Sequence, residues 1–170
     1  EEKDKNLLFN FINSLKEKNE SFKSQLYQDV FADYLIKNED RKTFLEFGAT
    51  NGIDLSNTYS LEKYSNWIGV LGEPDPQWYE NLKKNRPKTK IITKCVWKKT
   101  GDTIDFLSSK NGVLSTIKSF RYSDKESMSV NSKLRNKEFI NIKIDTISLN
   151  DLIKNEFDDI APSYISVDTE

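Results

Sequence analysis

The sequence predicts an α/β fold in which a mainly parallel sheet carries helices on both faces, and three observations predict it. From residue 43 onward, short apolar runs alternate with segments of helical periodicity, which is the pattern of βαβ units. The apolar runs are nearly continuous, as expected for strands that are buried on both faces. The first run ends at a loop with two glycines, Gly48 and Gly52, before the next helical segment. A length of 170 residues suits one domain with its own core.

The first 40 residues predict two helices. Apolar side chains recur at helical spacing in residues 7–15 and again in residues 26–35, and neither segment contains glycine or proline. The stretch between them, residues 18–24, is polar and predicts a turn. We therefore divide the chain into an N-terminal helical segment, residues 1–40, and an α/β domain, residues 41–170.

The strands and helices of the α/β domain follow from the same patterns. Strands are expected at residues 43–47, 67–72, 90–97, 103–107, 138–147 and 164–168. Helices are expected at residues 56–65, 74–85 and 149–155, the last opened by a capping box at Ser148. Residues 108–137 are rich in Ser, Lys and Asn and predict an insertion or a mobile loop. Ligand-binding loops normally follow a strand that ends in acids, so we expect further C-terminal strands that this sequence does not include.

Absent and rare residue types exclude several classes of chemistry. The chain has no histidine, which excludes a Ser-His-Asp triad and a His-ligated zinc site, and its single cysteine excludes an internal disulfide. The net charge of −1 gives no sign of a nucleic-acid partner. The apolar runs are far shorter than the roughly 20 residues of a membrane span, and the first five residues are unlike a signal peptide. We expect a cytoplasmic protein with no membrane or nucleic-acid partner.

The glycine loop predicts a nucleotide-type cofactor. The strand delivers the chain to Gly48 at the carboxyl edge of the sheet, where glycine lets the backbone approach a ligand. Glu73 ends the next predicted strand, 21 residues after Gly52, which is close to the spacing of a carboxylate that binds ribose hydroxyls. An ordinary turn at the end of a strand is the plain alternative.

The residues of the loop disfavour a dinucleotide. A G-x-G-x-x-G fingerprint would need glycine at positions 50 and 53, where the chain has Thr50 and Ile53, and no P-loop lysine follows. An acid at the start of the loop, Glu46, suits a cofactor whose amino-acid end is cationic. S-adenosylmethionine has such an end and also a ribose for Glu73.

Several linked blocks give the chain a resemblance to a known family. Between residues 24 and 170 the sequence contains, in order, SQ-x-x-QD, FLEFGA-x-x-G, SNT-x-x-LE, WIG, EP, TISLNDL and SVDTE. In these blocks it resembles the FkbM family of methyltransferases. The resemblance implies a Rossmann-like class I methyltransferase fold, S-adenosylmethionine as methyl donor, and usually O-methylation of a sugar, a polysaccharide or a small metabolite.

The resemblance also implies roles for particular residues. Those expected around the methionine end of the cofactor are Glu46, Phe47, Gly48, Ala49, Asn51 and Gly52. Ser56, Asn57 and Thr58 are expected at its carboxylate, with simple N-capping of the helix as an equal alternative. Glu73 and Pro74 are expected at the ribose, and Asp75, Cys95 and Val96 at the adenine, although Cys95 also suits a small buried residue. Asp168 and Glu170 are expected near the transferred methyl as a general base, as groups that orient the acceptor or as metal ligands.

The sequence therefore predicts an S-adenosylmethionine-dependent methyltransferase with a small-molecule or carbohydrate acceptor. A non-catalytic or degenerate module with the methyltransferase fold is the alternative from another class. A nucleotide-sugar or NAD enzyme is a weaker rival because of Thr50 and Ile53. The identity of the acceptor, the need for a metal and the oligomeric state are not predicted.

Overall fold

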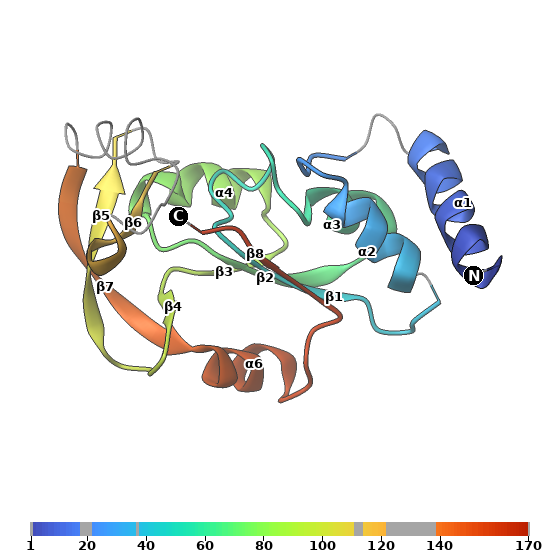
Figure 1. The fold of residues 1–170 in the computed structure, drawn as a ribbon. Helices are drawn as coiled ribbons and strands as arrows, with labels where there is room; N and C mark the ends of the chain where they lie inside the picture. The colour runs from blue at the N-terminus through green and yellow to red at the C-terminus, as the bar shows by residue number, and fades with distance from the viewer. Residues whose placement is uncertain (1, 18–21, 37, 111–113, 122–138, 170) are drawn as a thin grey trace.

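A parallel four-stranded sheet forms the centre of the molecule in a computed structural model, which describes residues 2–17, 22–36, 38–110, 114–121 and 139–169. Its strands are β1 (Thr43–Phe47), β2 (Ile68–Gly72), β3 (Lys90–Ile92) and β8 (Tyr164–Val167), in the order β3-β2-β1-β8. Both neighbours of β1 run parallel to it, and Phe47 is level with Gly72 on one side and Val167 on the other. The carboxyl ends of these strands therefore meet at one edge of the sheet (Figure 1).

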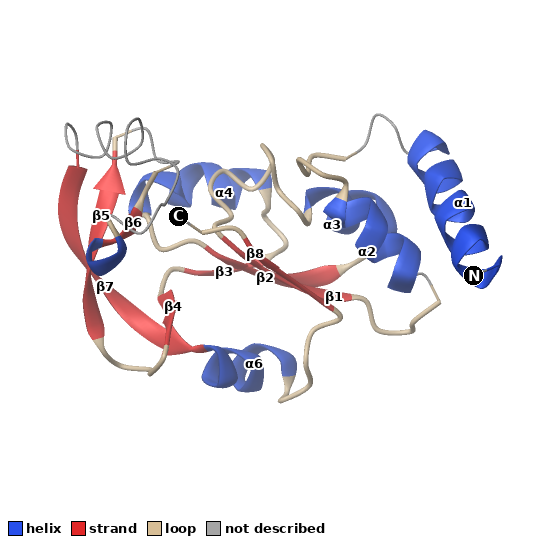
Figure 2. Ribbon diagram, viewed as in Figure 1, coloured by secondary structure: helices blue, strands red, loops and turns tan. Residues whose placement is uncertain are grey.

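Helices cover both faces of this sheet, as the sequence predicts (Figure 2). One face is covered by α2 (Gln28–Ile36), α3 (Tyr59–Ser65) and α4 (Tyr79–Asn85), which follows the short 3-10 helix η1 (Pro76–Trp78). The opposite face is covered by α6 (Leu149–Phe157). Each face has its own core, in which Phe44 packs with Leu61 and Leu82 on one side and Leu45 packs with Leu152 and Phe157 on the other.

The N-terminal helices pack on the same side as α3. Helix α1 (Glu2–Glu17) contacts α2 through the ring of Phe11, whose centroid lies 5.2 Å from that of Phe31. Helix α2 in turn reaches the central core: Ala32 is part of it, and the carboxylate of Asp33 accepts a hydrogen bond from the indole N–H of Trp67 at 2.9 Å. None of the described helices is long and apolar enough to cross a membrane.

A second four-stranded sheet lies beside the first, and the sequence patterns did not reveal it. Its strands are β4 (Cys95–Trp97), β5 (Thr103–Ser109), β6 (Thr116–Ile117) and β7 (Phe139–Ser148), in the order β4-β7-β5-β6. Strand β5 runs antiparallel to both β6 and β7, whereas β4 is parallel to β7. The 3-10 helix η2 (Lys118–Phe120) follows β6, so ordered elements occupy part of the segment predicted as an insertion or a loop. The rest of that segment, residues 111–113 and 122–137, lies outside the described residues.

The prediction of one strand over residues 90–97 was wrong, because the chain changes sheets within it. Residues 90–92 pair with β2, and residues 95–97 pair with β7. The backbone N–H of Glu73 still donates to the carbonyl of Ile92 at 2.9 Å, but the next residue is Pro74, which has no N–H to continue the ladder. The chain therefore leaves the first sheet at this point and enters the second.

Candidate functional site

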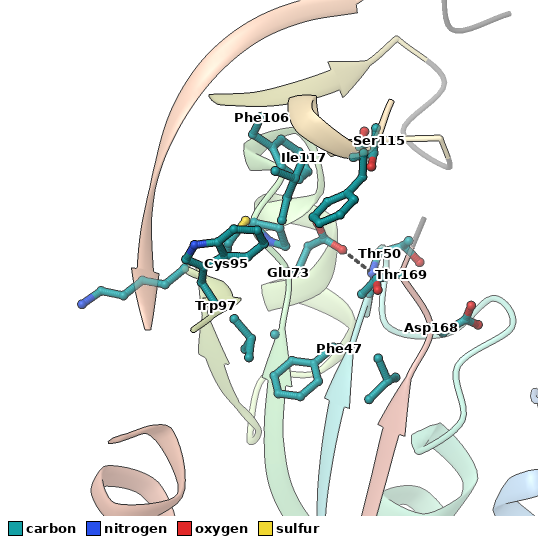
Figure 3. A pocket seen from close by; sticks show the side chains of 18 of the residues that line it. Phe47, Thr50, Glu73, Cys95, Trp97, Phe106, Ser115, Ile117, Asp168 and Thr169 are labelled. Carbon is teal, nitrogen blue, oxygen red and sulfur yellow. Dashed lines mark hydrogen bonds between the residues drawn. The ribbon is translucent and has the colours of Figure 1, made fainter. Parts of the chain in front are cut away.

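A cavity of about 550 Å³ opens where the carboxyl ends of β1, β2 and β8 face the second sheet (Figure 3). Two walls enclose it, one from each sheet. The first-sheet wall consists of Phe47, Gly48, Thr50, Gly72, Glu73, Pro74, Val167, Asp168 and Thr169. The opposite wall consists of Lys94, Cys95, Val96, Trp97, Phe106, Ser115, Thr116, Ile117, Phe120 and Leu149. In parallel α/β sheets, ligands bind in such a crevice beyond the carboxyl ends of the strands.

Gly48 is required at the point where β1 ends and the loop begins. Its φ of +80° lies in the left-handed region, and a Cβ there would lie 1.9 Å from the carbonyl oxygen of Asp168. Its N–H donates to the carbonyl of Gly72 at 3.0 Å, and the N–H of Asp168 donates to the carbonyl of Phe47 at 3.1 Å. Any larger residue would separate β1 from β8, so glycine lets the backbone form this floor of the cavity.

Glu73 lies directly after β2 and lines the cavity, and two backbone groups hold its carboxylate in place. Its Oε2 accepts a hydrogen bond from the N–H of Thr50 at 2.8 Å, and its Oε1 accepts one from the N–H of Asp75 at 2.8 Å. The residue is only 4% exposed. Burial raises the pKa of Glu73 to about 7, with a smaller contribution in the same direction from the Asp75 carboxylate, while the two N–H donors act in the opposite direction. A carboxylate has about four acceptor positions, so two remain for a ligand.

The wall from the second sheet is mainly apolar and aromatic. The rings of Trp97 and Phe120 meet edge to face, with centroids 5.9 Å apart, and Phe106 lines the same wall. Phe120 is 46% exposed although it is a large apolar residue. The thiol of Cys95 also lines the cavity, and burial raises its pKa to about 12, so it stays protonated at neutral pH. This surface suits a flat, apolar group opposite the carboxylate of Glu73.

The comparison with protein families identifies the domain. A family model described as the methyltransferase FkbM domain matches residues 46–170. The chain belongs to the FkbM methyltransferase family. No curated protein and no solved structure gave a match. The resemblance seen in the sequence blocks is thereby confirmed, and family membership supports a methyltransferase.

In this FkbM domain, six residues predicted to bind the cofactor line the cavity together with one predicted catalytic residue. They are Phe47, Gly48, Glu73, Pro74, Cys95, Val96 and Asp168. Asp168 lies at the exposed rim, and Figure 3 shows its carboxylate directed away from Glu73. Glu170, the other predicted catalytic residue, lies outside the described residues. Within the described part of the chain, no group of three or more Cys, Asp or Glu side chains could hold a metal ion.

Glu46 lies outside the cavity, buried beneath the start of α3. Its Oε1 accepts the N–H of Asn57 at 2.7 Å, and its Oε2 accepts the hydroxyls of Ser56 at 3.0 Å and Thr58 at 2.5 Å. Side chains alternate along β1, so Glu46 faces the α3 side whereas Phe47 faces the other side and lines the cavity. Burial raises the pKa of Glu46, and these hydrogen bonds and the nearby Arg86 act against that rise. The carboxylate thus organises the turn into α3, and a contact with the cofactor stays a prediction.

The residues predicted at the cofactor carboxylate belong to the same network as Glu46. The amide nitrogen of Asn57 donates to the hydroxyl of Ser166 on β8 at 2.9 Å, and the hydroxyl of Ser56 accepts the N–H of Tyr59 at 3.1 Å. Thr58 precedes α3 without a side-chain capping bond. The three side chains therefore fasten the start of α3 to β1 and β8, and none of them lines the cavity.

A buried arginine closes this network from the side of α4. Arg86 is 1% exposed; its Nε lies 2.5 Å from a carboxylate oxygen of Glu62, and its guanidinium also donates to the carbonyl of Gly52 at 3.0 Å. Gly52 has a φ of +78°, and a Cβ there would lie 2.6 Å from Leu82 and 2.8 Å from Arg86. The second glycine of the loop therefore makes room for the arginine, and Gly52 does not line the cavity.

The remaining predicted residues also lie away from the cavity. Ala49 is buried in the α3-side core, and the Asn51 side chain caps its own turn by accepting the N–H groups of Ile53 and Asp54 at 2.9 Å. The carboxylate of Asp75 is buried behind the wall and bonds to the second sheet.

Sequence reasoning missed most of the aromatic wall. Trp97, Phe106 and Ile117 come from a sheet that was not predicted, and Phe120 lies in η2, which follows β6. Thr50 could have been found, because it lies inside the glycine loop whose backbone was expected to approach a ligand; its N–H donates to Glu73.

Proposed function

We propose that this FkbM domain binds S-adenosylmethionine in the cavity and catalyses transfer of the methyl group to a hydroxyl oxygen of a sugar, a polysaccharide or a small metabolite. The main support for this proposal is the position of Glu73, whose carboxylate is held by two backbone N–H groups and lines the cavity at the carboxyl end of β2. Family membership supports methyl transfer as the reaction.

The order of the strands supports a Rossmann-like fold. The order β3-β2-β1-β8 places β2 and β3 on one side of β1 and the later strand β8 on the other. The direction of strand succession thus reverses at β1, and the crevice at such a reversal is where nucleotide cofactors bind in doubly wound sheets. Gly48 and Asp168, the residues that follow β1 and β8, both line the cavity there.

The residues present fit the chemistry of S-adenosylmethionine. A ribose offers two neighbouring hydroxyl donors, and Glu73 has two acceptor positions left after its backbone bonds. Val96 and Trp97 provide an apolar surface for the adenine, and the backbone of Gly48 would lie near the amino-acid end. When bound, the cofactor supplies an electrophilic methyl group, so the reaction needs little acid–base help from the protein.

The chain's own residues would then align the reactants and exclude water. The apolar wall lowers the local water content, which strengthens the interactions of Glu73 with a ligand. Alignment of two bound reactants can contribute several kcal/mol to the lowering of a barrier. We place the acceptor at the rim near Asp168, which is exposed and can accept a hydrogen bond from an acceptor hydroxyl.

Titration calorimetry with S-adenosylhomocysteine tests the binding half of the proposal. We expect the wild-type chain to bind and Glu73→Ala to bind about 10- to 100-fold more weakly, as for loss of hydrogen bonds to a charged group. Glu80→Ala is the matched control, because Glu80 is an exposed acid on α4. Absence of binding by the wild-type chain, or equal affinity of the Glu73→Ala variant, would overturn the proposal, and competition by NAD alone would favour the dinucleotide rival.

Transfer of a labelled methyl group tests the catalytic half. The chain is incubated with labelled S-adenosylmethionine and a panel of glycans and small hydroxylated metabolites, with Glu73→Ala as the negative control. Label in an acceptor with the wild-type chain supports an O-methyltransferase. Binding of the cofactor without transfer to any acceptor would support the non-catalytic module instead.

A further inference from the structure

Asp75 is a fully buried acid that lies just behind the cavity and contacts both sheets. It is 0% exposed, and its carboxylate accepts four hydrogen bonds. Oδ1 accepts the backbone N–H of Gln77 at 3.2 Å and the hydroxyl of Ser108 at 3.0 Å. Oδ2 accepts the amide N–H of Gln77 at 2.7 Å and the hydroxyl of Ser115 at 2.6 Å. One carboxylate thus links η1, which follows the first sheet, to β5 and to the residue before β6 in the second.

These bonds hold the roof of the cavity, which we define as residues 106–109 and 115–117. Within the roof, the hydroxyl of Ser115 accepts the N–H of Ser109 at 2.9 Å. From outside it, the side-chain amide of Gln77 donates to the carbonyl of Ser109 at 2.8 Å. Phe106 and residues 115–117 line the cavity. Among the described residues the two sheets share no strand pair. Side-chain bonds such as those of Asp75 therefore take the place of a backbone ladder.

The same residue also places Glu73. The N–H of Asp75 donates to Oε1 of Glu73 at 2.8 Å, while the Asp75 side chain points to the roof. A shift of Asp75 toward or away from the roof would therefore move one of the two donors that fix the Glu73 carboxylate. The position of the roof and the orientation of Glu73 depend on one short segment of chain.

We propose that Asp75 is a positioning residue that holds the roof over the cavity and orients Glu73, so that roof closure and cofactor affinity are coupled. The part that concerns affinity rests on the proposed function, whereas the part that concerns the roof does not. This role differs from a contact with the adenine, because Asp75 does not line the cavity.

An asparagine cannot replace Asp75 in this network. Each carboxylate oxygen of Asp75 accepts one N–H donor of Gln77, from the backbone on one side and from the side-chain amide on the other. Whichever way an asparagine amide is turned, its NH₂ group would face one of these donors. At least one hydrogen bond between Gln77 and residue 75 is therefore lost, although the size and shape of the side chain hardly change.

Hydrogen exchange of the free protein tests the role in the roof. We expect amide exchange in residues 103–109 and 114–117 to rise about tenfold or more in Asp75→Asn. The matched control is Asp105→Asn on β5, because the partners of Asp105 are the exposed residues Lys143 and Asn141. We expect amide exchange in this variant to match the wild type. Equal exchange in Asp75→Asn and the wild type would overturn the proposal.

Affinity for S-adenosylhomocysteine as a function of pH tests the coupling. We expect Asp75→Asn to bind about tenfold more weakly at pH 8. We also expect its binding to persist to lower pH, because the negative charge of Asp75 raises the pKa of Glu73. Tyr79 and Cys95 also face Glu73, but burial raises the pKa of each to about 12, so neither changes charge in this range.

A second variant separates positioning from a loss of folding. Ser115→Ala removes two bonds of the network, the one to Asp75 and the one from the N–H of Ser109, and keeps the charge of Asp75. We therefore expect faster amide exchange in the roof with no shift of the pH midpoint of binding. Faster exchange in Asp75→Asn with unchanged affinity and midpoint would overturn the coupling. If the wild type binds no S-adenosylhomocysteine, the proposed function fails, and the exchange experiment still decides the role of Asp75 in the roof.

Discussion

Lowering the pH from 8 to 6 is expected to weaken cofactor binding through a single carboxylate, Glu73. Its pKa of about 7 lies in the middle of this interval because the side chain is buried. If only the ionised form accepts both ribose hydroxyls, the binding-competent fraction falls from about 10/11 at pH 8 to about 1/11 at pH 6. The dissociation constant for S-adenosylhomocysteine should then rise about tenfold.

The stability of the free protein should change in the opposite direction. The folded-state pKa of Glu73 is raised above its ordinary value of 4.5, so the folded protein binds the proton more tightly than the unfolded chain between about pH 7 and 4.5. The Glu73 contribution therefore stabilises the fold as pH falls through this window, by up to about 1 kcal/mol per pH unit. Glu46 contributes with the same sign, so the difference between the wild type and Glu73→Ala isolates Glu73.

Calorimetric titrations and urea unfolding curves at pH 6, 7 and 8 measure both effects. Glu73→Ala serves as the reference in each, because ionisation of the ligand and of other side chains affects both proteins alike. A change of less than twofold in the dissociation constant between pH 6 and 8 would refute the reasoning. The same pH dependence in Glu73→Ala would refute it as well.

Three further substitutions test the parts of the fold that position the site. Gly48→Ala should lower the free energy of unfolding by about 2–4 kcal/mol in urea unfolding. Gly101→Ala is the control and should have a smaller effect, because Gly101 has a similar positive φ but a Cβ added there would meet no atom within 4 Å. Equal effects would show that the contact with the residue after β8 does not matter. Arg86→Met should lower the free energy of unfolding by about 3–5 kcal/mol because it leaves the Glu62 carboxylate without its buried partner, and a loss below 1 kcal/mol would contradict the network. Phe120→Ala should weaken S-adenosylhomocysteine binding about tenfold. It should not move the pH midpoint of binding, because a phenylalanine side chain does not titrate, and unchanged affinity would exclude this ring from the site.

Local patterns were sufficient for the central sheet. The apolar runs at residues 43–47, 67–72 and 164–168 became β1, β2 and β8, because strands covered by helices on both faces need continuous apolar residues. Gly48 and Glu73 could be predicted at the cavity because both follow strands that end at the same edge. The family followed from blocks of sequence and was confirmed by the match over residues 46–170.

Only the tertiary structure decided the second sheet and the different roles of the acids Glu46, Glu73 and Asp75. Residues 90–97 were predicted as one strand, yet their two ends pair with different partners, and no local pattern records which partner a strand will meet. Glu46 lies near the end of β1 and Asp75 lies shortly after β2, but their oxygens accept hydrogen bonds from residues outside these strands, such as Ser56 before α3 and Ser115 before β6. Where a buried carboxylate points depends on which donors surround it after folding, because each buried oxygen must find a partner. The sequence by itself therefore determined the family, the central sheet and the position of Glu73, and folding determined which acid faces the cavity and which ones hold it together.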